Sequence, residues 1–336
     1  MTIVTRAVTE DESDIRLDRW FRRHFPGIPQ GVIEKLCRTG QLRVDGHRAE
    51  AATRLASGQT VRVPPLPVPA TKPAAVPAVP PNPKLLRELE SMVLWRDPQL
   101  IVLNKPSGLA TQGGPGITRH LDGMLEAWRE DGQRPRLVHR LDRDTSGVIV
   151  LARTPGVAAK LAASFRGRDM EKIYWAVVAG RPVPVEGRID LPLVRAEDFR
   201  TGRVEVAGPG AEDPARAVTE YRTLDHAARL LAWLELRPLT GRTHQLRVHC
   251  AAIGTPILGD EAYGTRRGPA DPDRAGENTA LVEGLDHRLH LHARRLVLPH
   301  PAGGTLAVEA PLPPHMEASF HTLGFTAPRL RPPQRG

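Results

Sequence analysis

Cysteine, aromatic residues and long apolar runs are all scarce in this chain of 336 residues. The two cysteines, Cys37 and Cys250, lie far apart and form no CxxC pair, which excludes a disulfide framework and argues against a thiolate metal site. Only 4% of the residues are aromatic, and the first residues include acids where a signal peptide would be apolar. No segment reaches the roughly 18 apolar residues of a transmembrane helix. The composition therefore predicts a soluble, cytoplasmic protein with no membrane partner.

The usual cofactor motifs are missing as well. The chain contains no GxxxxGKS/T phosphate loop, no GxGxxG turn after a strand, no HExxH and no GxSxG elbow. These absences remove the usual support for ATP, dinucleotide, zinc-hydrolase and serine-hydrolase functions. We therefore expect no cofactor and no metal, so that any catalysis uses acid, base and arginine side chains.

Positive charge is what the chain has in excess. It carries 47 Lys plus Arg against 38 Asp plus Glu, a formal net charge of +9, which favours a polyanionic partner. Only 6 of those cations are lysines, and the arginines accompany much Ala, Pro and Gly. A GC-rich genome produces the same bias, so the charge suggests nucleic acid without establishing it.

Proline marks the clearest domain boundary. Residues 64–84 contain prolines throughout and no glycine, a composition that favours extended polyproline II and acts as a semi-rigid spacer. We expect a linker there, between a small domain at 13–63 and a catalytic domain at 91–316. The proline- and arginine-rich tail, 327–336, is expected to be disordered.

The small domain combines short helices with a hairpin. Apolar residues recur at helical spacing in Leu17–Phe21 and Val32–Cys37, Asp45-Gly46 is a hairpin turn signal, and 58–64 alternates like a strand. The order and spacing resemble the small RNA-binding domain of the S-four type. That resemblance implies a platform of α/β type that presents arginines to structured RNA. The candidate contacts are Arg19, Arg22, Arg38 and Arg43, although each taken alone also fits an ordinary solvated face.

The larger segment has more strands than helices. Strand-like runs lie at 100–106, 148–154, 173–180, 230–238 and 294–301, and a helix is expected after Thr154 with Pro155 in its first turn. Because strands and helices do not alternate strictly, the pattern predicts an α+β fold. We expect a mixed, mainly antiparallel sheet flanked by helices and loops, with surface loops near 196–216 and 264–285.

Two polar clusters could carry chemistry. In the first, His139–Gly147, Asp142 lies among apolar flanks and would need a cationic partner to stay ionised; a structural turn explains this segment equally well. In the second, Leu239–Gly254, we favour a helix capped by Thr243 and ended by Gly254 over a strand. His244 and Arg247 would then share one face, although a solvated basic helix end remains open.

The chain is similar to the RluA-type pseudouridine synthases, in particular to the RluC and RluD branches. Five motifs occur in the family's order across most of 91–316. They are NKPSGL (Asn104–Leu109), HRLDRDTSG (His139–Gly147), EKIYWAVVAG (Glu171–Gly180), GRTHQLRVH (Gly241–His249) and PILGDEAYG (Pro256–Gly264).

This resemblance implies roles for individual residues. Asp142 corresponds to the catalytic aspartate, Tyr174 to the tyrosine that packs on the target base, and Arg247 to the arginine paired with the aspartate. Arg140 corresponds to a residue that holds the site open when the base is flipped out. We add Arg242 and His244, from the same helix motif, as RNA-binding candidates.

The implied reaction converts uridine in RNA to pseudouridine without a cofactor. Large-subunit ribosomal RNA is the expected substrate, which would make the protein part of ribosomal RNA processing and ribosome biogenesis, with transfer RNA second. We expect a monomer that does not act on DNA. Two other functions stay open: a non-catalytic RNA-binding or ribosome-assembly factor, and a hydrolytic nucleosidase or glycosidase, although a hydrolase usually needs two opposed carboxylates.

Overall fold

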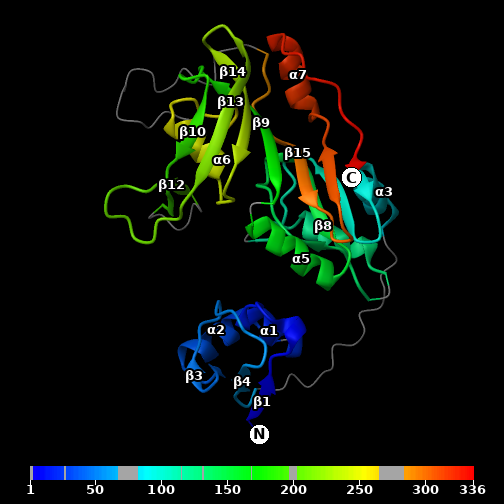
Figure 1. Cartoon of the computed structure of the whole chain (residues 1–336), viewed down its shortest axis with the longest axis vertical. Helices are drawn as coiled ribbons and strands as arrows, with labels where there is room; N and C mark the ends of the chain where they lie inside the picture. The colour runs from blue at the N-terminus through cyan, green and yellow to red at the C-terminus, as the bar shows by residue number, and fades with distance from the viewer. Residues whose placement is uncertain are drawn as a thin grey trace. The chain divides into compact units, whose positions relative to one another are not determined.

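The computed structural model describes residues 3–25, 28–66, 82–114, 116–130, 132–167, 169–196, 203–264 and 284–336 (Figure 1). The chain forms two compact units, Met1–Pro80 and Pro81–Gly336. Most of the linker predicted at 64–84 lies outside the described residues, which resume at position 82. Within the described ranges, no helix has the length and apolar content needed to span a bilayer.

The N-terminal unit packs two short helices against a small antiparallel sheet. Helices α1 (Leu17–His24) and α2 (Gln30–Arg38) lie where the apolar spacing predicts them and follow a 3-10 turn, η1 (Glu10–Glu12). The strand order is β1-β4-β2-β3. The strand bounds are β1 (Val4–Ala7), β2 (Arg43–Val44), β3 (His47–Arg48) and β4 (Thr60–Val63).

The β2–β3 hairpin forms at the predicted turn. Asp45 and Gly46 have φ angles of 48° and 79°, the two left-handed residues that a tight hairpin of type I′ requires. The Asp45 carboxylate also accepts hydrogen bonds from the Thr60 backbone N at 2.7 Å and from Thr60 Oγ1 at 3.0 Å. These bonds join the hairpin to β4 and fix the sheet.

The second unit is built on one long sheet. Its strand order is β10-β13-β14-β9-β15-β8-β6-β5, with β16 beside β15, β17 beside β16 and β7 beside β8. Among these strand pairs, β15 and β8 run parallel and the others antiparallel. The predicted fold class is therefore confirmed. The bounds are β5 (Val93–Arg96), β6 (Leu100–Lys105), β7 (Arg136–Leu137), β8 (Ser146–Ala152), β9 (Glu171–Ala179), β10 (Glu186–Asp190), β13 (Val218–Ala227), β14 (Leu231–Pro238), β15 (Leu291–Pro299), β16 (Thr305–Glu309) and β17 (Gln334–Arg335).

Helices lie against the sheet (Figure 1), and buried apolar side chains fill the space between them. The predicted helix after Thr154 is present as α5, and the Thr154 side chain accepts a hydrogen bond from the Val157 backbone N. Leu161 of α5, Cys250 of α6 and Phe320 of α7 each belong to a different buried cluster on the sheet. The helix bounds are α3 (Pro83–Ser91), α4 (Leu121–Met124), η2 (Leu125–Trp128), α5 (Pro155–Arg166), α6 (Gln245–Ala252) and α7 (Pro314–Leu323).

Two segments predicted to be irregular contain strands. Within 196–216, β12 (Val204–Val206) pairs with β11 (Leu193–Arg195). Within the tail 327–336, β17 pairs with β16, so the prediction of a disordered tail is wrong there. An edge strand pairs through its backbone N–H and C=O groups, which every segment except proline can match. Amino-acid composition therefore does not predict such pairings. Of the loop predicted at 264–285, residues 265–283 lie outside the described residues.

Gly147 joins the Asp142 loop to the sheet, and we predict that it tolerates no side chain. Its φ is 109°, and a Cβ atom there would overlap the backbone of Ala293 on β15. Gly147→Ala should therefore lose about 3 kcal/mol or more of unfolding free energy, measured by urea denaturation. Gly156→Ala on α5, where a Cβ meets open space, is the control. Equal stability of the two variants would contradict this account.

Candidate active site

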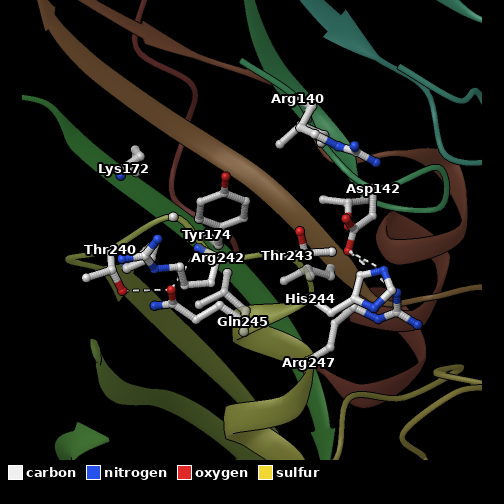
Figure 2. Close-up of a pocket in the computed structure, with 16 residues that line it drawn as sticks. Arg140, Asp142, Lys172, Tyr174, Thr240, Arg242, Thr243, His244, Gln245 and Arg247 are labelled. Carbon is white, nitrogen blue, oxygen red and sulfur yellow. Dashed lines mark hydrogen bonds and ion pairs between the residues drawn. The ribbon is translucent and has the colours of Figure 1, made fainter. Parts of the chain in front are cut away.

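A pocket opens where the loop before β8 faces β9 and the start of α6 (Figure 2). Its volume is about 150 Å³, a size at which a cavity can admit a six-membered ring. The lining residues with polar or charged side chains are Arg140, Asp142, Thr145, Lys172, Tyr174, Thr240, Arg242, Thr243, His244, Gln245 and Arg247.

Asp142 lies on a loop that is clamped on both sides. The Thr111 hydroxyl donates to the Leu141 carbonyl at 2.6 Å and accepts from the Leu141 backbone N at 3.2 Å. On the other side, the fully buried Lys105 ammonium donates to the carbonyls of Arg143, Leu109 and Pro106. Burial lowers the pKa of Lys105 to about 7, although the charges of Asp144 and Asp142 oppose that shift. These contacts fix the backbone from which the Asp142 carboxylate projects.

Arg247 faces Asp142 but is anchored by another aspartate. Its Nε and Nη2 atoms each donate to Asp260 at 2.7 Å, whereas its Nη1 lies 3.5 Å from Asp142 Oδ2. Burial opposes the charge of Arg247, but the Asp260 hydrogen bonds outweigh it and raise the pKa of the guanidinium. Asp260 therefore neutralises and orients Arg247, and the long contact leaves Asp142 free to meet a substrate.

His244 is the second group that faces the Asp142 carboxylate. Its Nε2 lies 3.9 Å from Asp142 Oδ2, and its Nδ1 lies 2.8 Å from the Tyr263 hydroxyl. That hydroxyl also accepts from the Val204 backbone N at 3.0 Å, and its own proton can be donated to a neutral Nδ1. Burial lowers the pKa of His244, which favours the neutral ring. When the Tyr263 hydroxyl donates to Nδ1, the ring N–H lies on Nε2, towards Asp142.

Backbone strain accompanies this placement of His244. Its φ of 54° and ψ of 14° are left-handed, a conformation that costs a non-glycine residue roughly 1 kcal/mol or more. The hydrogen bond to Tyr263 holds the ring in place. Strained residues that their surroundings fix in this way gather at functional sites.

Tyr174 supplies an aromatic face in the pocket. It projects from β9 and packs with buried clusters on both sides of its position in the sheet. Burial, and then the nearby charge of Asp142, raise the pKa of the phenol. Tyr174 is therefore protonated at neutral pH and can offer a ring and a hydrogen-bond donor.

The start of α6 is held by Gln245 instead of the predicted cap. The helix begins at Gln245, with His244 at the N-cap position and no side-chain cap, so the prediction that Thr243 caps it is wrong. Gln245 Oε1 accepts hydrogen bonds from Thr240 Oγ1 at 2.7 Å and from the Arg242 backbone N at 3.1 Å. Its amide nitrogen donates to Val218 O and Thr219 Oγ1. This buried side chain therefore organises the turn, while Gly254 ends the helix with a φ of 78°.

The residues predicted for the site fall into two groups. The pocket brings together Asp142, Tyr174, Arg247, Arg140, Arg242 and His244. The other four lie on the N-terminal unit, where Arg19, Arg22 and Arg38 are exposed. Arg43 is half-buried and donates to the carbonyls of Gly40 and Gly46, so its guanidinium partly serves its own turn.

Several residues that build the site were not among those predicted from the sequence. Asp260 and Tyr263 lie in the quoted motif PILGDEAYG, yet their contacts to Arg247 and His244 cross 13 and 19 residues of chain. Lys105 also lies in a quoted motif, NKPSGL, yet its contact to the Arg143 carbonyl crosses 38 residues of chain. In the described part of the chain, no group of three or more His, Cys, Asp or Glu side chains is placed to hold a metal ion.

Comparison with known proteins places the chain in a family. Residues 99–252 match the family RNA pseudouridylate synthase. The ribosomal large subunit pseudouridine synthase C of Vibrio cholerae is 36% identical, over 93% of this chain and 94% of its own length. The chain belongs to the RluA family of RNA pseudouridine synthases. It is thus an isomerase.

Two further similar proteins agree with this assignment. RNA pseudouridine synthase 4, mitochondrial, of Arabidopsis thaliana is 35% identical, over 93% of this chain and 80% of its own length. The solved structure of human RNA Pseudouridylate Synthase Domain Containing 4 superposes with a TM-score of 0.59 at 33% identity. That match covers 73% of this chain and 98% of the human chain.

Proposed function

We propose that this synthase isomerises uridines in large-subunit ribosomal RNA, with Asp142 as the catalytic carboxylate. The observation that carries the proposal is Asp142 itself, the only acidic side chain among the described residues that line the pocket. Arg247 and His244 face its Oδ2 atom. The bacterial relatives named for the large ribosomal subunit support the choice of RNA.

The chemistry requires one carboxylate beside a ribose. The bond between ribose and the ring nitrogen breaks, the uracil turns while bound, and a carbon–carbon bond forms to the same sugar. An electron-poor sugar of this kind is stabilised by a carboxylate, as in glycosidases. A hydrolase usually needs a second carboxylate to activate water, and none is present among the described lining residues.

Tyr174, Arg140 and Arg242 have complementary roles in this proposal. The extruded uracil would lie against the Tyr174 ring, where stacking offsets part of the cost of leaving the RNA stack. Arg140 and Arg242 are exposed and would contact the surrounding RNA. Both arginines line the same pocket as Asp142, so their contacts would orient the nucleotide.

The N-terminal unit is proposed to add RNA affinity. Arg19 and Arg22 project from α1 and Arg38 from the end of α2, and all three are exposed. Phosphate contacts of this kind position a protein on RNA without reading its sequence. The unit would thereby hold the synthase on structured RNA.

Mapping of pseudouridines tests the proposed substrate. In cells that lack this gene, we expect one or more pseudouridines to disappear from large-subunit ribosomal RNA and to return with the wild-type gene but not with Asp142→Asn. Chemical mapping of ribosomal and transfer RNA measures both. Loss confined to transfer RNA would contradict the choice of substrate, and no loss in either would contradict the function.

A further inference from the structure

Lys172 is a pocket cation with no counter-ion among the residues that the structure describes. It lies on β9, two residues before Tyr174, so both side chains leave the same face of the strand. The side chain is half-buried and lines the pocket, yet among the described residues no hydrogen bond or ion pair reaches its ammonium. By contrast, Arg247 has Asp260 and Lys105 has three carbonyls.

The surroundings of Lys172 leave its charge uncompensated. Burial lowers its pKa, and no carboxylate in the described part of the chain raises it again. The nearby His139 is neutral, because burial and the Lys172 charge lower its pKa to about 3, and its Nε2 accepts a hydrogen bond from the Val150 backbone N. A half-desolvated ammonium gains from an acceptor or an anion beside it, so this pocket suits a ligand that supplies one.

The position of Lys172 selects the part of the nucleotide that it meets. In Figure 2, Tyr174 lies between Lys172 on one side and Asp142 on the other. With the ribose at Asp142 and the uracil on the Tyr174 ring, the far edge of the base points to Lys172. That edge of uracil carries carbonyl oxygens, and an ammonium offers three donors and no acceptor.

We propose that Lys172 binds a uracil carbonyl oxygen and stabilises the detached base during the isomerisation. This inference rests on the proposed function. When the C1′–N1 bond breaks, its electron pair stays on the base, and the negative charge spreads over N1, O2 and O4. Lys172 then faces that charge inside a partly water-excluded pocket, where a placed donor acts most strongly.

Rotation of the base keeps this contact. Turning uracil by half a revolution about its N3–C6 axis exchanges C5 with N1 and O4 with O2, so a carbonyl faces Lys172 before and after. C5 then supplies the electron pair of the new bond to C1′ and loses its proton, and N1 takes up a proton. The freely turning ammonium can follow either oxygen, whereas the amino group of cytosine would be repelled.

The test compares leaving groups. Lys172→Met should lower the single-turnover rate on a uridine-containing RNA by about 100-fold or more, as loss of one oxyanion donor does, with little change in KM. Lys172→Arg should recover part of the rate. On the same RNA carrying 5-fluorouridine, the base is a weaker base and a better leaving group, but C5 has no proton to lose, so the rate is measured as consumption of the target nucleoside. On that RNA the Lys172→Met defect should shrink by about tenfold or more. Lys160→Met, on the exposed face of α5, is the control.

Each outcome separates this inference from the proposed function. A Lys172→Met rate equal to that of Lys160→Met, a defect confined to KM, or the same defect on both RNAs would overturn the role of Lys172. Thermal melting identifies loss of fold, in which case Lys172→Arg and Lys172→Gln carry the comparison. Wild-type protein that forms no pseudouridine would instead overturn the proposed function.

Discussion

Replacement of Asp142 by asparagine should abolish pseudouridine formation while leaving RNA binding intact. Asparagine keeps the shape and an acceptor oxygen that can face Arg247 and His244, but it lacks the negative charge that the ribose requires. We expect the single-turnover rate to fall by about 10⁴-fold or more, as for loss of a catalytic group in other enzymes. The RNA dissociation constant should change by less than about threefold, because phosphate contacts dominate affinity.

Asp144→Asn is the matched control for this prediction. Asp144 lies on the same loop, pairs with Arg143 and is 42% exposed, and it does not line the pocket. Its substitution should leave the rate within a few fold. A rate for Asp142→Asn near that of Asp144→Asn would show that another group performs the chemistry.

Replacement of Asp260 should damage both stability and catalysis, although Asp260 lies behind the pocket wall. Its carboxylate is fully buried and accepts two hydrogen bonds from Arg247 and one each from the backbone N atoms of Ala262 and Tyr263. Asp260→Ala leaves the Arg247 charge buried without its partner, which costs about 3–5 kcal/mol. The freed guanidinium would then bind Asp142 directly and compete with the substrate.

The expected result is a loss of about 3 kcal/mol or more in urea denaturation and, at a temperature where the variant stays folded, a rate lowered by about 100-fold. Asp260→Asn, which keeps the shape, should lie between the wild type and Asp260→Ala. The control is Asp286→Asn, since Asp286 pairs with Arg288 at the surface and exposed pairs contribute about 1 kcal/mol or less. Equal effects at both sites would contradict the anchoring role of Asp260.

Local sequence signals predicted much of the fold. The Asp45-Gly46 turn, the helix capped by Thr154 and the apolar runs of β6, β8 and β14 each act within a few residues, so their patterns were sufficient. The elements that were predicted wrongly depend on partners that are distant in the sequence. β12 and β17 are strands because β11 and β16 offer them backbone groups. Helix α6 starts one residue later than a Thr243 cap would place it, and Gln245 at its start binds β13.

The same distinction applies to the site. Family resemblance picked out Asp142, Tyr174 and Arg247 because each stands inside a recognisable motif, and all three meet in one pocket. Nothing in the sequence indicated that Asp260 neutralises Arg247 or that no described side chain pairs with Lys172. Those properties depend on which charges the fold brings together, and a linear pattern does not contain that information.

Product analysis on purified protein tests the central claim most directly. An RNA labelled with tritium at C5 of uridine is incubated with the protein, without added cofactor, and the released tritium, pseudouridine and free uracil are measured. Isomerisation at Asp142 predicts tritium release matched one for one by pseudouridine, with no free uracil and no release by Asp142→Asn. Free uracil, or release that survives in Asp142→Asn, would contradict it.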